Sequence, residues 1–141
     1  MEKSMGSLNM AEESTYLGID FGRSKIGLAI ADEETRMAFA FDTLKNDNKF
    51  LENLRKIMVS KQVKTIIIGM VRHENDPESA AEKEKFGQML EKELGVPVAY
   101  QDEMFTTKMA QENIKARGGR NIAAADDQEA ARIILQSWLD K

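Results

Sequence analysis

The hydrophobic pattern of this chain changes period near residue 49, and that change limits the folds that the chain can adopt. Three short runs, at residues 16–20, 25–31 and 36–43, have the composition of strands and are joined by short polar links. Strands joined so closely pair as an antiparallel meander. Beyond them, Phe50, Leu54 and Ile57 recur at helical spacing.

The second half of the chain alternates strands with helices. The β-branched run at residues 65–69 predicts a buried central strand, and residues 96–101 predict a further strand. Between them, the Asp-Pro-Glu string at residues 76–78 is typical of a helix start, and Gly95 of a helix end. The chain thus has three consecutive strands followed by strands that alternate with helices. This order predicts an α/β fold with a mixed sheet flanked by helices.

Two more helices are expected near the C-terminus. Residues 106–117 form the first, which ends at a pair of glycines. Asp126 and Glu129 resemble an acidic capping box, so the last helix should begin at Asp126. The expected order of elements is βββαβαβαα.

Composition indicates a single globular domain and limits the chemistry. Of 141 residues, 42% are hydrophobic and 31% charged, and no apolar run approaches membrane-spanning length. We expect residues 1–14 to be a flexible leader, residues 15–141 to form one domain, and the protein to be cytoplasmic. With no cysteine and one histidine, a metal site would consist mainly of carboxylates, which favours Mg²⁺ or Mn²⁺.

Acidic residues stand at the ends of three expected elements. Asp20 ends the first strand, Asp102 and Glu103 follow the strand at residues 96–101, and Asp127 lies at the start of the last helix. Strand ends of an open sheet converge on one edge. Carboxylates that meet there repel one another unless a cation binds between them. Two ions about 4 Å apart would activate a water and stabilise the leaving oxygen of a phosphodiester.

Ordinary structural roles remain open for each of these acids. Asp20 alone is compatible with a turn residue, and Asp102 and Glu103 with a solvated loop. Asp126 and Asp127 are both compatible with helix capping. If Asp126 is the cap, then Asp127 is free to project, so we favour Asp127 as the ligand.

Candidate substrate-binding residues lie near these acids in the sequence, or in the loop that follows the buried strand at residues 65–69. They offer a tight turn, a positive charge or a hydroxyl to a phosphate group. They are Gly22, Arg23, Lys25, Arg72, Thr106, Thr107 and Arg120. Against them stands the net charge of −4, because nucleic-acid-binding surfaces are usually basic.

Four ordered strings of this chain resemble the YqgF/RuvX family of Holliday junction resolvases and pre-16S rRNA nucleases. Residues 17–22 with 26–29 resemble the family's opening, and Gly69-Met70 the start of its G-L-P loop. Residues 102–107 resemble its D-E-x-x-T-T string, and residues 127–136 its D-x-x-A-A-x-x-I-L-Q ending. The resemblance implies an RNase H-like fold with catalytic, metal-binding acids at Asp20, Glu103 and Asp127.

The chain departs from the family pattern at Met104, where the family usually has arginine, and in the G-L-P loop, which lacks proline. Loss of a guanidinium removes a bidentate phosphate contact. Our leading hypothesis is a metal-dependent endonuclease acting on structured RNA or branched DNA. The alternative is a nucleic-acid-binding factor with weak or no catalysis.

Other properties stay open at this level. The sequence does not choose between RNA and DNA, or between a monomer and a homodimer. The I-D-F-G-R-S string at residues 19–24 also resembles the first phosphate loop of actin-like and sugar-kinase-like ATPases. That reading ranks low, because such proteins need two such domains.

Overall fold

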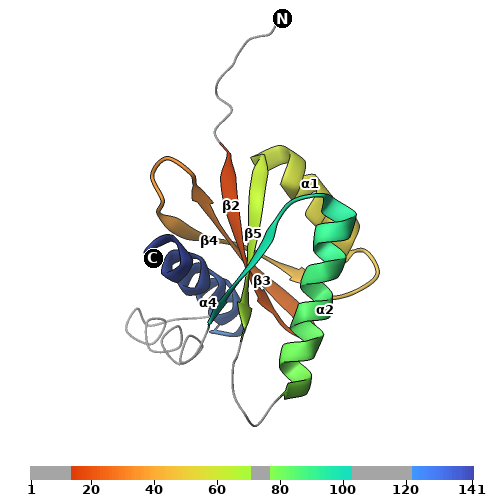
Figure 1. Cartoon of the computed structure of the whole chain (residues 1–141). Coiled ribbons are helices and arrows are strands. Elements are labelled where there is room, and N and C mark those ends of the chain that lie inside the picture. The colour runs from red at the N-terminus through yellow and green to blue at the C-terminus, as the bar shows by residue number, and fades with distance from the viewer. Residues whose placement is uncertain (1–13, 71–76, 103–121) are drawn as a thin grey trace, which may run out of the picture.

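The structure, a computed structural model, describes residues 14–70, 77–102 and 122–141. Figure 1 shows the elements, which are β2 (Thr15–Phe21), β3 (Lys25–Asp32), β4 (Ala38–Lys45), α1 (Phe50–Lys61), β5 (Val63–Met70), α2 (Pro77–Leu94), β6 (Val98–Asp102) and α4 (Ile122–Leu139). Of the predicted leader, only Ser14 lies within these ranges. The helix predicted at residues 106–117 lies outside them.

The strands form one mixed sheet in the order β4-β3-β2-β5-β6. β2 pairs antiparallel with β3, and β3 with β4, as expected of strands joined by short turns. β5 pairs parallel with β2, and β6 with β5. Figure 1 shows α4 on one face of the sheet and α1 and α2 on the other. The predicted mixed sheet flanked by helices is therefore confirmed.

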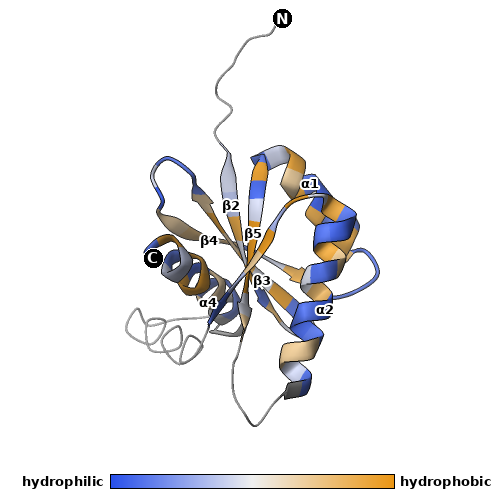
Figure 2. Ribbon diagram, viewed as in Figure 1, coloured by the Kyte–Doolittle hydropathy of each residue, from blue (hydrophilic) through white to orange (hydrophobic). Residues whose placement is uncertain are grey.

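The sheet separates two cores of different character. On the face of α1 and α2, the core is built from large side chains such as Leu17, Ile19 and Ile68. On the face of α4, small residues such as Ala29 and Ala31 pack against the helix. Figure 2 shows hydrophobic residues along the sheet and on the inner sides of the helices, with hydrophilic residues outside. The small residues allow α4 to lie closer to its face.

Gly18 is the point of closest approach between β2 and α4. A Cβ atom placed on Gly18 would lie 2.7 Å from the Cβ of Leu135 and 2.8 Å from the carbonyl oxygen of Ala131. Both separations are shorter than a normal van der Waals contact. The helix therefore rests on the backbone of β2.

The structure corrects the predicted boundaries of two strands. β4 begins at Ala38 and not at Arg36, because Arg36 has a φ of 56°, which belongs to a turn and not to a strand. β6 begins at Val98 and not at residue 96, since Pro97 has no amide hydrogen to donate to a ladder.

The predicted start of the last helix was wrong. α4 begins at Ile122, so Asp126 is not its N-cap, and Asp127 lies inside the helix. Three consecutive alanines at residues 123–125 have the highest helix propensity and account for the earlier start. Glu129 pairs with Arg132 within the helix and does not complete a capping box.

None of the helices in the described parts of the chain is long and apolar enough to cross a membrane.

We expect the Gly18→Ala variant to be less stable than the wild type by roughly 1–3 kcal/mol, because its methyl group would force α4 away from the sheet. Urea denaturation measures the change. Ala40→Val, which enlarges an exposed residue of β4, is the control and should change stability by less than about 0.5 kcal/mol. Unchanged stability of Gly18→Ala would contradict the close approach.

Candidate functional site

Asp20 lies on the α4 face of the sheet, near the end of β2. Side chains alternate between the faces of a strand. Tyr16 packs in the core beneath α4, and Gly18 contacts the same helix. Asp20 has the same parity, so its carboxylate also projects on this face.

Gly27 brings Asp127 close to Asp20. Gly27 of β3 is the cross-strand partner of Asp20 and so faces α4 as well. A Cβ atom on Gly27 would overlap the carbonyl group of Asp127 and lie 2.9 Å from the Cβ of Asp127. The backbone of α4 therefore rests on Gly27, and Asp20 and Asp127 are neighbours of the same glycine.

A hydrogen bond to β4 holds this part of α4 in register. Thr43 is the cross-strand partner of Gly27, and its hydroxyl oxygen accepts a 3.1 Å hydrogen bond from the Nε2 of Gln128. Because Gln128 follows Asp127 in the chain, this bond limits rotation of the helix about its axis. The position of Asp127 thus depends on contacts with two strands.

The residues that lie level with Asp20 and Gly27 across the sheet continue into β5 and β6. Ile19 pairs with Ile68, so Asp20 aligns with Gly69, and Gly69 pairs with Gln101. Gly69 and Gln101 have the parity of Ile67 and Ala99, which pack on the α4 face. Asp20 therefore stands between two glycines, with Gln101 beyond the second.

Asp102 lies on the opposite face from Asp20. It has the parity of Val98 and Tyr100, which pack against the core beneath α1 and α2. Alternation along β6 therefore excludes Asp102 from the carboxylate pair. Glu103, the residue that we predicted as the second acid, lies outside the described residues.

Two lysines lie side by side at the same end of the α4 face. Lys25, a predicted phosphate ligand, is the cross-strand partner of Lys45, and both are exposed. Like charges directly opposite each other on a sheet are destabilising unless an anion binds them. Sequence reasoning missed Lys45, and the register of β3 with β4 is the signal that finds it.

The predicted residues Gly22 and Arg23 form the turn between β2 and β3. The turn is tight, because a Cβ on Gly22 would overlap the carbonyl of Lys25. Asn46 braces it by donating a 2.8 Å hydrogen bond to the Gly22 carbonyl. Arg23 is largely exposed and lies 4.0 Å from a carboxylate oxygen of Glu82 on α2.

Two open hollows of about 380 and 280 Å³ separate this turn from α2. Arg23 and Glu82 line both hollows, and Lys83 lines the smaller one. Arg23 thus lies at the same end of the sheet as Asp20, but on the side of α2.

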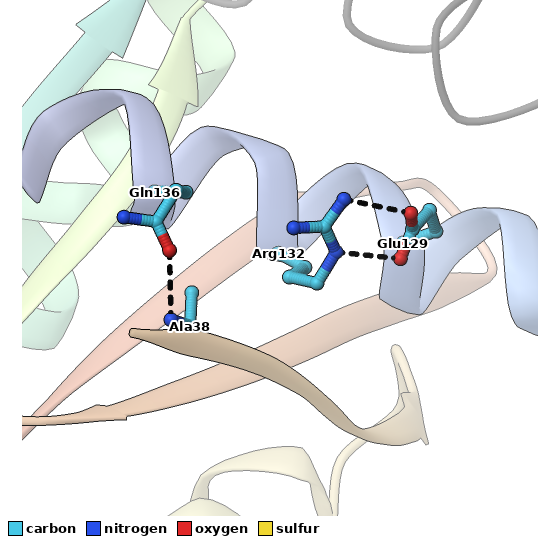
Figure 3. A network of polar contacts seen from close by, with 4 residues as sticks. All are labelled: Ala38, Glu129, Arg132 and Gln136. Atoms are coloured by element: carbon cyan, nitrogen blue, oxygen red, sulfur yellow. Dashed lines mark hydrogen bonds and ion pairs between the residues drawn. The ribbon is translucent and has the colours of Figure 1, made fainter. Parts of the chain in front are cut away.

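A buried ion pair stabilises α4 beside Asp127. Figure 3 shows Arg132 donating hydrogen bonds of 2.8 Å to both carboxylate oxygens of Glu129. The pKa of Arg132 is raised, first by this hydrogen bond. Both oxygens of Glu129 therefore accept hydrogen bonds from a residue one turn farther along the same helix.

The described part of the chain contains no group of three or more acids, histidines or cysteines able to hold a metal ion. The predicted residues outside it are Glu103, Arg72, Thr106, Thr107 and Arg120. Asp20 and Asp127, which both lie next to Gly27, nevertheless have the carboxylate chemistry that a hard divalent cation prefers. Such a cation would offset the repulsion between them.

Comparison with known proteins gives consistent results. Residues 14–141 match a family model described as "RuvX: Holliday junction resolvase". A Burkholderia ambifaria (strain MC40-6) protein named "Putative pre-16S rRNA nuclease" is 31% identical over 137 residues, covering 93% of this chain and 92% of the relative. A protein of the same name from Anaeromyxobacter sp. (strain K) is 36% identical over 131 residues, with 89% and 96% covered.

Among solved structures, T. thermophilus RuvC in complex with a Holliday junction substrate superposes with a TM-score of 0.54. The match covers 89% of this chain and 93% of that chain at 16% identity. This likeness supports the RNase H-like fold.

We expect Arg132→Met to destabilise the protein by about 2–3 kcal/mol, because it removes the guanidinium that pairs with the buried carboxylate of Glu129. The Arg132 side chain is 30% exposed, so the loss should stay below that of a fully buried pair. Arg55→Met, which breaks an ion pair with 50% and 41% exposed side chains, is the control and should lose less than about 1 kcal/mol. If chemical denaturation shows the same loss of stability in both variants, the Glu129–Arg132 pair contributes no more than an exposed ion pair.

Proposed function

This chain belongs to the RuvX Holliday junction resolvase family, and we propose that it is a divalent-cation-dependent nuclease that cleaves phosphodiester bonds in structured nucleic acid. The observation that carries the proposal is the packing of Asp127 onto Gly27, the cross-strand partner of Asp20. The names of the relatives suggest processing of pre-16S rRNA. The family description suggests resolution of junctions.

In this proposal, Asp20, Asp127 and Glu103 together hold one or two Mg²⁺ or Mn²⁺ ions. A bound divalent cation would activate the attacking water and neutralise charge on the phosphate. Glu103 is chosen over Asp102 because Asp102 has the parity of the opposite face. Gly27 contributes by allowing the helix backbone to approach, so that Asp127 is held by packing in the absence of any ligand.

The basic residues at this sheet edge would position the substrate. Lys25 and Lys45 present adjacent positive charges on the α4 face, and each can pair with a phosphate oxygen. Arg23, on the side of α2, would contact a phosphate farther along the same strand or on a second strand. Arg72, Thr106, Thr107 and Arg120 remain candidates from the sequence alone.

We expect Asp20→Asn and Asp127→Asn each to reduce Mg²⁺- or Mn²⁺-dependent cleavage by more than the roughly 10–100-fold typical of an outer-shell residue. The assay compares a precursor of the 16S rRNA 5′ end, a four-way DNA junction and a single strand. Asp42→Asn, at an exposed carboxylate of β4, is the control and should cleave like the wild type. Full activity of Asp20→Asn would exclude the mechanism.

The same assay separates the proposal from its alternative. A binding factor would hold the RNA or the junction in a salt-dependent manner and show no turnover with either cation. Met104, which replaces the arginine usual in the family, is the residue that favours this alternative.

We expect Lys45→Gln to weaken nucleic-acid binding and to reduce the slope of log K against log salt by about 0.7–0.9, the value of one phosphate contact. Stability should stay equal or rise slightly, because repulsion from Lys25 is removed. Lys56→Gln, at an exposed residue of α1 that pairs with Glu52, serves as the control. If the slope equals that of the control variant, Lys45 does not contact a phosphate of the bound nucleic acid.

A further inference from the structure

We propose that Gln101 is an additional ligand of the Asp20–Asp127 site, and that its side-chain oxygen binds the divalent cation directly. The proposal rests on the proposed function, because it assumes a cation beside Asp20. It adds a residue that neither the acidic strings of the sequence nor the family resemblance indicates.

The side-chain oxygen of Gln101 is a buried acceptor without a partner. The Oε1 atom is fully buried and has no hydrogen-bond partner among the described residues. The Nε2 atom donates a 3.3 Å hydrogen bond to the carbonyl oxygen of Asp102. A carbonyl can only accept, so the nitrogen must face Asp102 and the oxygen is the atom left unpaired.

An unpaired buried acceptor lowers the stability of the folded state, and native proteins contain few of them. Such atoms are expected where a ligand completes the site. Gln101 lies near the end of β6 and has the parity of the α4 face, the same face on which Asp20 projects.

The register of three strands places Gln101 in the same row as Asp20. Gly69 pairs with Gln101 and aligns with Asp20, so only a glycine separates the two residues across the sheet. Two strand spacings correspond to about 10 Å between their Cα atoms. An aspartate and a glutamine that both extend toward one ion can span that distance, and Gly69 has no side chain to block it.

The chemistry of an amide oxygen suits this place. Mg²⁺, Mn²⁺ and Ca²⁺ accept neutral carbonyl oxygens together with carboxylates. A neutral donor completes the coordination without adding to the repulsion between Asp20 and Asp127. Gln101 therefore strengthens cation binding and leaves the charge of the site unchanged.

The test is a Mn²⁺ titration of the full chain, with calorimetry for affinity and thermal unfolding for stability, so that no readout depends on cleavage. We expect Gln101→Met to raise the dissociation constant for Mn²⁺ by roughly 10-fold. Without metal its melting temperature should equal or exceed that of the wild type, because the lost oxygen was unpaired. Gln101→Glu, which retains an oxygen at this position, should restore binding.

Two controls keep the outcomes distinct. Gln88→Met, at an exposed residue of α2, should bind Mn²⁺ like the wild type. Asp20→Asn should lose Mn²⁺ binding. If Asp20→Asn loses binding while Gln101→Met retains it, or if Gln101→Glu fails to restore it, the role of Gln101 is overturned and the proposed function stands. If Asp20→Asn binds like the wild type, the proposed function itself fails.

Discussion

The contact between the backbone of α4 and the glycines of the sheet is the constraint on which the rest of this structure depends. Gly18 and Gly27 lie on adjacent strands, and a side chain at either would collide with the helix. Because the backbone of α4 rests on both glycines, van der Waals contacts fix the distance and position of the helix above the sheet. The packing of α4 on Gly27 thus fixes Asp127 beside the cross-strand partner of Asp20.

The two faces of the sheet bury side chains of different size. The face beneath α1 and α2 buries large aliphatic and aromatic side chains, whose removal from water stabilises the fold. On the face beneath α4, β3 and β4 contribute the small residues Ala29, Ala31 and Ala38. Polar groups can therefore gather at its edge without weakening the main core.

The fold could be predicted from sequence because its signals are local. Short links between three strands and a later alternation of strands and helices were enough for the mixed sheet. The start of α4 was wrong, since a capping pattern at Asp126 was preferred over the helix propensity of the alanines before it. A capping pattern and helix propensity can favour different first residues for a helix, and the observed start reflects the sum of these preferences over several residues.

The partners of Asp20 needed information that no local pattern contains. Asp20 and Asp127 were predicted as metal ligands, but the reason for their proximity is Gly27, for which no packing role was predicted. Lys45 and Gln101 were not predicted, because the roles that we propose for them depend on register, and register is set by the pairing of strands distant in sequence. The choice of Glu103 as the third ligand rests on the family resemblance and on the finding that Asp102 has the parity of the opposite face.

The bond between Gln136 and Ala38 has a consequence for how copies of this protein can associate. β4 is an edge strand with the exposed side chains Met37 and Phe39 near its start, and open edges invite pairing with another chain. The amide of Ala38 donates a 2.9 Å hydrogen bond to Oε1 of Gln136 (Figure 3), and β4 carries a bulge opposite Leu28 and Ala29. The Gln136 side chain thus occupies the amide of Ala38, and the bulge makes the strand irregular, and both features disfavour pairing with another chain at this part of the edge. Extension of the sheet from this strand would therefore have to break the Gln136–Ala38 hydrogen bond or begin beyond Ala38.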